Sequence, residues 1–388
     1  MSFPNQQAVP PSSSNRPSWL TKIDGFWQRV TDGLEIGQLW KQFHTDARAS
    51  FQLYRRDSEA QSTPESHASG WWHTAKQFAW AILDKLSPAR RVLLLIALLL
   101  LLFGGGQFSH RNDDGNITVI TWPLQFYGGA LLFILLMLEI ADRVVMKRDL
   151  EIARDIQGWL LPATPPTVPG LNIAFATRPA NTVAGDYYDV FQRAADQPQF
   201  LIAVADVAGK SIPAALLMAT FQASLKTLSA TPTSLADLVS GMNRYACTNS
   251  QNGLRFTTAF LAEYNPENRK LNYINAGHNN PMLLRSNGSI ERLTEGGLPL
   301  GIMSDKTYES GEVVLSSGDW LVIFTDGLVE AENQRQEEYG EARLQQALQA
   351  GNTTTPQDLL RRIMTDLDYF VGATPQHDDV TCLLIKAA

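Results

Sequence analysis

Aspartates at the ends of short apolar runs, in the second half of the chain, are the residues best suited to do chemistry. Two follow six-residue runs typical of buried strands, at 200–205 and 320–325; a third lies within 184–189, and a fourth enters the run 380–385. One aspartate at a strand end commonly caps a turn. Several that meet at one sheet edge would instead supply the oxygen ligands and negative charge that a hard divalent cation requires. The four candidates are Asp186, Asp206, Asp326 and Asp378.

Two kinds of phosphate-binding loop are excluded by the residues at particular positions. The Gly-Lys-Ser of residues 209–211 follows a strand and precedes a helix, as in a nucleotide-binding loop, but Val204 stands where that motif needs glycine. Neither Cys247 nor Cys382 is followed by the arginine of a cysteine-dependent phosphatase loop. Two cysteines also exclude a disulfide scaffold, and the six histidines show no zinc-site spacing.

Length and charge limit the remaining classes. The 388 residues are 44% hydrophobic and 18% charged, with a net charge of −7. At ~100–200 residues per domain, the chain should form two or three structural units. The acidic balance argues against binding to nucleic acid, because affinity for the phosphate backbone comes from clustered lysine and arginine.

The first 91 residues divide into four predicted segments. Residues 1–17 are polar and proline-rich, lack the pattern of a signal peptide, and are expected to be disordered. Residues 18–56 form a predicted amphipathic helical segment in the cytoplasm, since apolar residues recur there at steps of three and four. Its apolar face would be covered by a partner helix or by a membrane surface. A linker at 57–70 and a juxtamembrane helix at 71–91 follow.

Two apolar stretches predict a transmembrane hairpin with helices at 92–108 and 122–140. The first begins with twelve consecutive apolar residues, and each stretch is near the lower limit of the ~17–25 residues that span a bilayer. A buried hairpin in a soluble bundle is the alternative. Lysine and arginine flank the two stretches and are nearly absent between them. This asymmetry predicts a multi-pass protein of the inner (cytoplasmic) membrane, with both termini cytoplasmic and the lipid bilayer as a partner.

A linker helix is expected at 141–161, continuing the second apolar stretch. Hydrophobic residues at heptad spacing form a short coiled-coil pattern there, which leaves a homodimer through residues 142–161 open. Four prolines between 162 and 169 then end the helix, because proline removes a backbone donor and biases the preceding residue towards extended conformations. The C-terminal domain is therefore placed at 170–388.

Eight blocks of sequence carry a resemblance to a known family. They are Leu160–Pro162, Pro179–Ala180, Gly185–Asp189, Ala205–Lys210 with Pro213–Met218, Ala276–Asn279, Gly297–Gly301, Thr325–Gly327 and Asp378–Thr381. In content and order they resemble the bacterial SpoIIE-type protein serine phosphatases, which belong to the protein phosphatase 2C superfamily. The resemblance covers about residues 155–388.

This resemblance implies a fold of the α+β class, a four-layer αββα sandwich with two metal ions at one end of the paired sheets. The pattern of short apolar runs and helical stretches fits such a sandwich. The predicted strands include 257–264, 271–275 and 282–285, and the predicted helices include 213–228, 234–245 and 357–370. The full prediction is a phosphatase sandwich preceded by a two-helix transmembrane hairpin.

The same resemblance implies a role for each aspartate. Asp206 would bridge two Mg²⁺ or Mn²⁺ ions, with the backbone carbonyl of Val207 on one of them. Asp326 and Asp378 would hold the other ion, and Asp186 would act directly or through bound water. Two such ions roughly 3.5–4 Å apart can activate a water for in-line attack on a phosphoryl group.

Polar neighbours and three departures from the family pattern complete the predicted site, and one departure is Asn280, which stands before Pro281 where the family commonly has two prolines. Asp189 and Asp379 either orient metal-bound water or cap local structure. His278 is interpreted as a turn histidine satisfied by backbone groups and is left out of the catalytic set. Ala184 and Ser211 stand where the family usually has glycine. They put the loop conformations in doubt, because a glycine position can require a positive φ.

The predicted function is a metal-dependent protein serine/threonine phosphatase in signal transduction. By resemblance, its substrate would be a phosphorylated anti-sigma-factor antagonist. A separate hypothesis is that the helix at 142–161, through dimerisation or the state of the membrane, positions the loops around Asp206 and Asp186. The alternative is a membrane-anchored pseudophosphatase that binds a phosphoprotein without turnover.

Overall fold

Two compact units divide the chain, Met1–Ile140 and Ala141–Ala388. The structure, a computed structural model, describes residue 83 and residues 86–103, 107–111, 117–121, 124–193, 198–209, 211–231, 233–249, 255–350 and 355–388. The predicted segments 1–17, 18–56 and 57–70, and most of 71–91, lie outside the described residues.

In the first unit, a helix and a hairpin lead into a second helix. α4 (Pro88–Phe103) is followed by the antiparallel pair β1 (Gln107–Arg111) and β2 (Ile117–Thr121). α5 (Leu124–Leu160) begins here and continues without a break into the second unit. Gly128 lets α5 approach α4 closely, because a Cβ there would lie only 2.9 Å from the carbonyl oxygen of Ala97.

The predicted transmembrane hairpin is not supported, and the predicted multi-pass location in the inner membrane is wrong. Among the described residues, no helix is both long and apolar enough to cross a membrane. α4 has 16 residues, which at 1.5 Å per residue reach ~24 Å, less than the ~30 Å of a hydrocarbon core. Residues 107 and 108, predicted as helical, belong to β1. α5 is longer, but its second half is charged from residue 142 onward.

The second unit is built on two mainly antiparallel sheets. The six-stranded sheet has the order β10-β7-β6-β5-β4, with β11 also paired to β7, and the five-stranded sheet has the order β3-β13-β12-β8-β9. The strands of the first sheet are β4 (Tyr187–Gln192), β5 (Phe200–Val207), β6 (Thr257–Asn265), β7 (Lys270–Ala276), β10 (Gly296–Gly297) and β11 (Gly311–Val314). Those of the second are β3 (Leu171–Arg178), β8 (Met282–Leu284), β9 (Ile290–Arg292), β12 (Trp320–Phe324) and β13 (Val380–Ala387).

Alternation along the strands builds three layers of core. In β5, Ile202 and Val204 pack between the two sheets, whereas Leu201 and Ala203 face the helices on the other side, as the two-residue period of a strand requires. Because both faces of β5 are covered, its residues 200–205 are all apolar. The core between the sheets also takes residues such as Phe260 of β6 from the first sheet and Leu383 of β13 from the second.

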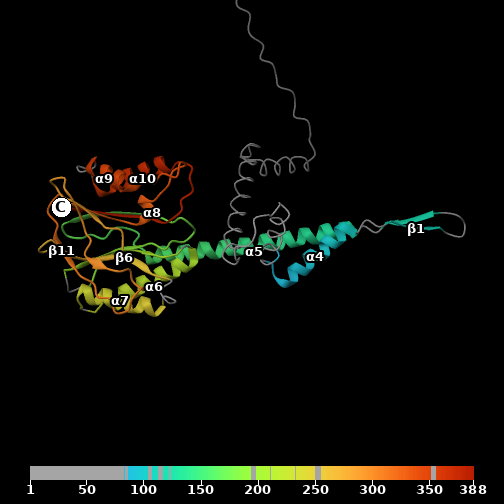
Figure 1. The fold of residues 1–388 in the computed structure, drawn as a ribbon, viewed down its shortest axis with the longest axis horizontal. Helices are drawn as coiled ribbons and strands as arrows, with labels where there is room; N and C mark the ends of the chain where they lie inside the picture. Colours follow the sequence, from blue (N-terminus) through green and yellow to red (C-terminus); the bar gives the residue numbers. More distant parts are fainter. Residues whose placement is uncertain are drawn as a thin grey trace, which may run out of the picture. The chain divides into compact units, whose positions relative to one another are not determined.

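Helices cover the outer face of each sheet, which confirms the predicted four-layer sandwich of the α+β class (Figure 1). α6 (Ser211–Ser229) and α7 (Leu235–Asn249) pack on the six-stranded sheet. On the five-stranded sheet lie α8 (Asp326–Val329), α9 (Gly340–Ala350) and α10 (Pro356–Val371). Thr355 caps α10, since its side chain accepts a hydrogen bond from the backbone N–H of Asp358.

Phe260→Ala should lower the free energy of unfolding by about 3–5 kcal/mol, because it leaves a cavity between the sheets. Phe260 is fully buried and stacks on Tyr273 with ring centroids 5.7 Å apart. Urea titration measures the change. Tyr369→Ala, at a side chain of α10 that is 90% exposed, is the matched control and should stay within about 0.5 kcal/mol of the wild type. Equal losses in both variants would contradict this view of the core.

Candidate functional site

Strand ends of both sheets bring the four predicted site aspartates into one region. Asp206 is the next-to-last residue of β5, and Asp186 directly precedes β4, the neighbour of β5. Asp326 begins α8 just after β12, and Asp378 lies two residues before β13, the neighbour of β12. Burial, and then the negative charges of Asp326 and Asp378, raise the pKa of Asp206 to about 7. The carboxylates therefore repel one another.

Asp186 is the most deeply buried of these carboxylates. Its side chain accepts a hydrogen bond at Oδ2 from the hydroxyl of Thr325 at 2.9 Å, and that hydroxyl oxygen accepts one from the backbone N–H of Thr381. Burial, and then the charge of Asp206, raise the pKa of Asp186 well above its usual value. The other oxygen, Oδ1, is buried without a hydrogen-bond partner among the described residues. Such an atom favours a bound cation or an ordered water.

Asp379 holds the loop that leads to Asp186. Its Oδ1 accepts a hydrogen bond from the backbone N–H of Ala180 at 2.7 Å, and its Oδ2 accepts one from Gly185 at 2.6 Å. Burial raises the pKa of Asp379, and these two hydrogen bonds oppose that shift. Because Asp379 follows Asp378 in the chain, it ties the Asp186 loop to the start of β13. These contacts favour the structural alternative for Asp379.

A second support of the same loop comes from α5 and was missed from the sequence. The buried amide of Gln157 donates to the carbonyl oxygen of Ala184 at 2.7 Å and accepts from the N–H of Ala184 at 2.9 Å. Both backbone groups of Ala184 are therefore paired with one side chain, two residues before Asp186. The only sequence signal was a neutral polar residue close before the Leu160–Pro162 block, which predicts no particular contact.

Asp189 and His278 are engaged elsewhere. The carboxylate of Asp189 forms an ion pair with Lys226 at 2.6 Å. The buried backbone N–H of His278 donates to the side-chain oxygen of Asn275 at 2.7 Å, and burial lowers the pKa of its ring to about 4. Its ring Nδ1 lies 3.1 Å from the hydroxyl oxygen of Thr258, and its Nε2 is buried without a hydrogen-bond partner among the described residues. Backbone groups alone therefore do not satisfy this histidine, and its exclusion from the catalytic set stays a prediction.

The backbone at Gly185, Ser211 and Ala184 shows which of these positions requires a glycine conformation. A Cβ on Gly185 would lie 3.1 Å from the carbonyl oxygen of Val207, so the Asp186 loop lies directly beside that carbonyl. Ser211 adopts a φ of +64°, the left-handed region that favours glycine. Ala184 does not adopt a positive φ, so its side chain meets no such strain.

The donor chemistry of the cluster fits a hard divalent cation. Its side-chain donors are carboxylate oxygens, one of them buried without a partner, and a cation would relieve their repulsion. Among the described residues, no three His, Cys, Asp or Glu side chains are arranged as a ready cage around one ion. Mg²⁺ usually keeps several waters and takes only one or two carboxylates from the protein. The geometry thus fits a largely hydrated ion better than a zinc-type cage.

Comparison with known sequences identifies relatives of this unit. The family model described as Stage II sporulation protein E (SpoIIE) matches residues 196–388. The phosphoserine phosphatase RsbU of Bacillus subtilis (strain 168) is 30% identical over 244 residues, which cover 62% of this chain and 70% of RsbU. Protein IcfG of Synechocystis sp. is 28% identical over 273 residues, which cover 64% of this chain. The chain spans only 42% of IcfG.

Solved structures share the fold. The SiaA-PP2C domain of Pseudomonas aeruginosa superimposes with a TM-score of 0.55 at 22% identity, covering 64% of this chain and 99% of that domain. The RsbU and RsbW domains of Rv1364c from Mycobacterium tuberculosis give a TM-score of 0.50 at 24% identity, covering 59% of this chain and 63% of that one.

We expect the chelator-treated protein to lose stability as the pH rises from 3.8 to about 7, the ordinary and the folded pKa of Asp206. Within that window the folded state binds more protons than the unfolded state, so each increase in pH favours unfolding. Thermal unfolding followed by circular dichroism measures the slope. Asp206→Asn should reduce it, whereas Asp305→Asn, at an exposed turn, should not. An unchanged slope in Asp206→Asn would argue against this shift.

Gln157→Leu should speed amide exchange at residues 184–186 and lower the free energy of unfolding by about 1–3 kcal/mol, because it leaves buried backbone groups unpaired. Hydrogen–deuterium exchange with mass spectrometry measures the loop directly. Gln349→Leu, at an exposed position of α9, is the control. If the loop exchanges at the wild-type rate in Gln157→Leu, the contact does not hold it.

Proposed function

Since this chain belongs to the family of SpoIIE-type serine phosphatases, we propose that it hydrolyses phosphoserine or phosphothreonine on a regulatory protein. The chemistry would take place at the aspartate cluster of the C-terminal unit. The observation that carries the proposal is the placement of Asp206 at the end of a strand of one sheet, with Asp326 and Asp378 beside strands of the other and near enough for their charges to add to burial in raising the pKa of Asp206. A protein with no use for a cation would gain stability by separating these charges.

The proposed metal ligands are the carboxylates of Asp186, Asp206, Asp326 and Asp378 and the carbonyl oxygen of Val207. They would hold two Mg²⁺ or Mn²⁺ ions. Ions so held polarise a phosphoryl group and lower the pKa of water. The chain itself keeps the donors in place.

Contacts in the fold hold two of the proposed ligands, Asp186 and Asp206. Thr325 fixes one oxygen of Asp186 and leaves the other available. Asp379 and Gln157 hold the loop before Asp186 from two sides. Asp206 is fixed by the pairing of β5 with β6, in which it lies opposite Thr258. Such prior orientation lowers the cost of assembling donors around a substrate.

The proposed substrate is a phosphorylated anti-sigma-factor antagonist of a partner-switching pathway. This proposal is supported by membership of the RsbU-like family and by the similarity to the phosphoserine phosphatase RsbU. The similar structure from Mycobacterium tuberculosis combines an RsbU domain with an RsbW domain, and it supports the fold alone at this identity.

Asp326→Asn should abolish metal-dependent phosphate release, with a loss of at least about 100-fold, because removing a ligand charge forfeits several kcal/mol of transition-state stabilisation. The assay uses the full chain with Mn²⁺, Mg²⁺ or chelator, on a small aryl phosphate and on a phosphoserine peptide. Asp305→Asn removes the same charge from an exposed turn and is the control.

Two results would contradict the proposal in different ways. Wild-type turnover by Asp326→Asn would refute the ligand assignment. Tight metal binding by the wild type without turnover of either substrate would favour the binding module, a pseudophosphatase that holds a phosphoprotein.

A further inference from the structure

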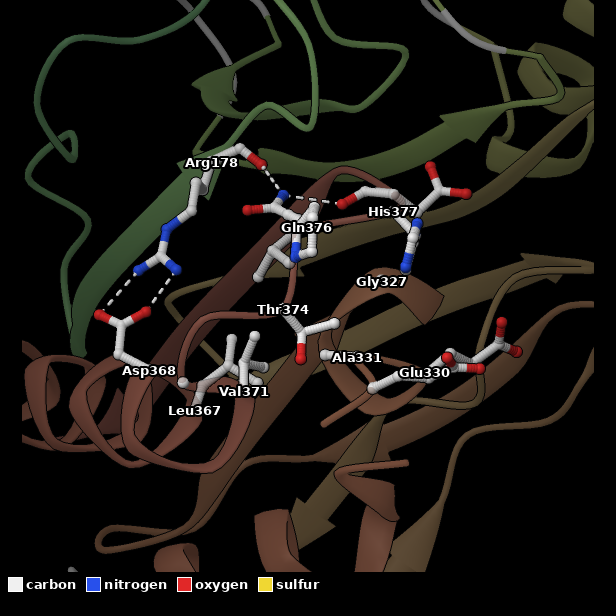
Figure 2. A pocket seen from close by; sticks show the side chains of 15 residues that line it. Arg178, Gly327, Glu330, Ala331, Leu367, Asp368, Val371, Thr374, Gln376 and His377 are labelled. Carbon is white, nitrogen blue, oxygen red and sulfur yellow. Dashed lines mark hydrogen bonds and ion pairs between the residues drawn. The ribbon is translucent and has the colours of Figure 1, made fainter. Parts of the chain in front are cut away.

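A cavity of about 450 Å³ opens beside the aspartate cluster, on the side of the five-stranded sheet. Figure 2 shows Gly327 and His377 at one end and the pair Arg178–Asp368 at the other. Gly327 follows Asp326, and Asp378 also lines the cavity. The cavity is therefore continuous with two of the proposed metal ligands, and its volume lies in the range of small-ligand sites, ~300–1,000 Å³.

The middle of the cavity has an apolar wall. Leu367 and Val371 of α10 and Ala331 line it (Figure 2), and so does Val380 at the start of β13. Between them lies Thr374, whose hydroxyl is buried without a hydrogen-bond partner among the described residues. An extended aliphatic stem would pack against this wall, and the hydroxyl is left available to a polar group.

Carboxylates stand around this apolar wall, and their charge is only partly compensated. Arg178 lines the cavity, but its guanidinium forms a bidentate pair with Asp368, with N–O distances of 2.5 and 3.1 Å. Glu330 and Glu332 also line it. Among the described residues, the charged groups that act on Glu330 are all acidic and include Asp378. Glu330 and Glu332 therefore give the cavity negative charge that the proposed metal ligands do not include.

The loop around Gln376, at the top of the cavity in Figure 2, is held by two hydrogen bonds. The side-chain amide of Gln376 donates to the carbonyl oxygen of Arg178 at 2.8 Å and to that of Asp378 at 2.7 Å. One side chain therefore connects the end of β3 to the residues before β13 (Figure 2). A fixed cavity of this kind can select by shape and charge.

We propose that this cavity binds a lysine or arginine side chain of the phosphoprotein, at a position near the phosphorylated residue. The inference rests on the proposed function. The stem of such a side chain would lie on Leu367 and Val371, and its cationic head would reach Glu330 and Glu332. Long basic side chains bury their methylene stems in this way while the charge stays in a polar setting. A hydrophobic residue would leave the carboxylates without a partner, and an acidic one would be repelled.

The test compares phosphoserine peptides that differ at one position. A single lysine is moved stepwise along both sides of the phosphoserine in a neutral sequence, and a methionine peptide of the same length serves as the reference at each step. Dissociation constants are measured by fluorescence anisotropy with the full chain, once with chelator and once with Mg²⁺. Turnover of the same peptides and of a small aryl phosphate is measured separately.

At one position of the scan, lysine should improve affinity about tenfold over methionine, the effect of one hydrogen bond to a charged group. Glu332→Gln should reduce this ratio of affinities, and Glu332→Lys should bring it to one or below, so that the methionine peptide binds at least as tightly as the lysine peptide. Glu312→Gln removes the same charge from an exposed position of β11 and should leave the ratio unchanged.

Failure of this proposal can be told apart from failure of the proposed function. Equal affinity for lysine and methionine peptides at every position would overturn the pocket assignment, even if all peptides and the aryl phosphate are turned over. A lysine preference that responds to Glu332 but comes with no turnover of any substrate would support the pocket and remove the hydrolytic function. A preference that Glu312→Gln abolishes equally would also overturn the assignment.

Discussion

Mutual repulsion between carboxylates is the constraint on which the rest of the C-terminal unit depends. Asp206 comes from one sheet and Asp326 and Asp378 from the other, and their negative charges add to burial in raising the pKa of Asp206 to about 7. Without the rest of the fold, the segments that carry these aspartates would move apart. The packed core between the sheets, with fully buried residues such as Phe260 and Leu383, prevents this separation, so hydrophobic burial holds in place an arrangement that electrostatics alone disfavours.

The loop before Asp186 shows how the remaining freedom is removed. It has no regular secondary structure, yet its backbone is bound by Asp379 at the start of β13 and by Gln157 of α5. Each contact pairs buried backbone groups that would otherwise be costly. The position of Asp186 therefore depends on three parts of the chain at once: the loop itself, the last strand and the helix that enters the unit.

Local patterns predicted most of this unit but not its cross-connections. Apolar runs that end in aspartate predicted β5 and β12 and singled out Asp206 and Asp326. This was possible because a strand and the residue that follows it are adjacent in the sequence. The partners of Gln157 and Asp379 lie 27 and nearly 200 residues away in the chain, and no periodicity reports such pairs. The transmembrane prediction failed because apolar content and flanking charge do not show where a helix ends. Where α4 ends and β1 begins is decided by hydrogen bonding, which hydropathy does not measure.

The position of β13 has a consequence for synthesis. It is translated after every other strand of the sandwich, yet it lies between β3 and β12 inside the five-stranded sheet and is preceded by Asp378 and Asp379. A nascent chain that has not yet reached β13 exposes two unpaired strand edges, which are sites for wrong pairing. It also lacks both the carboxylate at position 378 and the clamp on the Asp186 loop. The last strand of the sandwich must therefore be made and inserted before the four aspartates can come together.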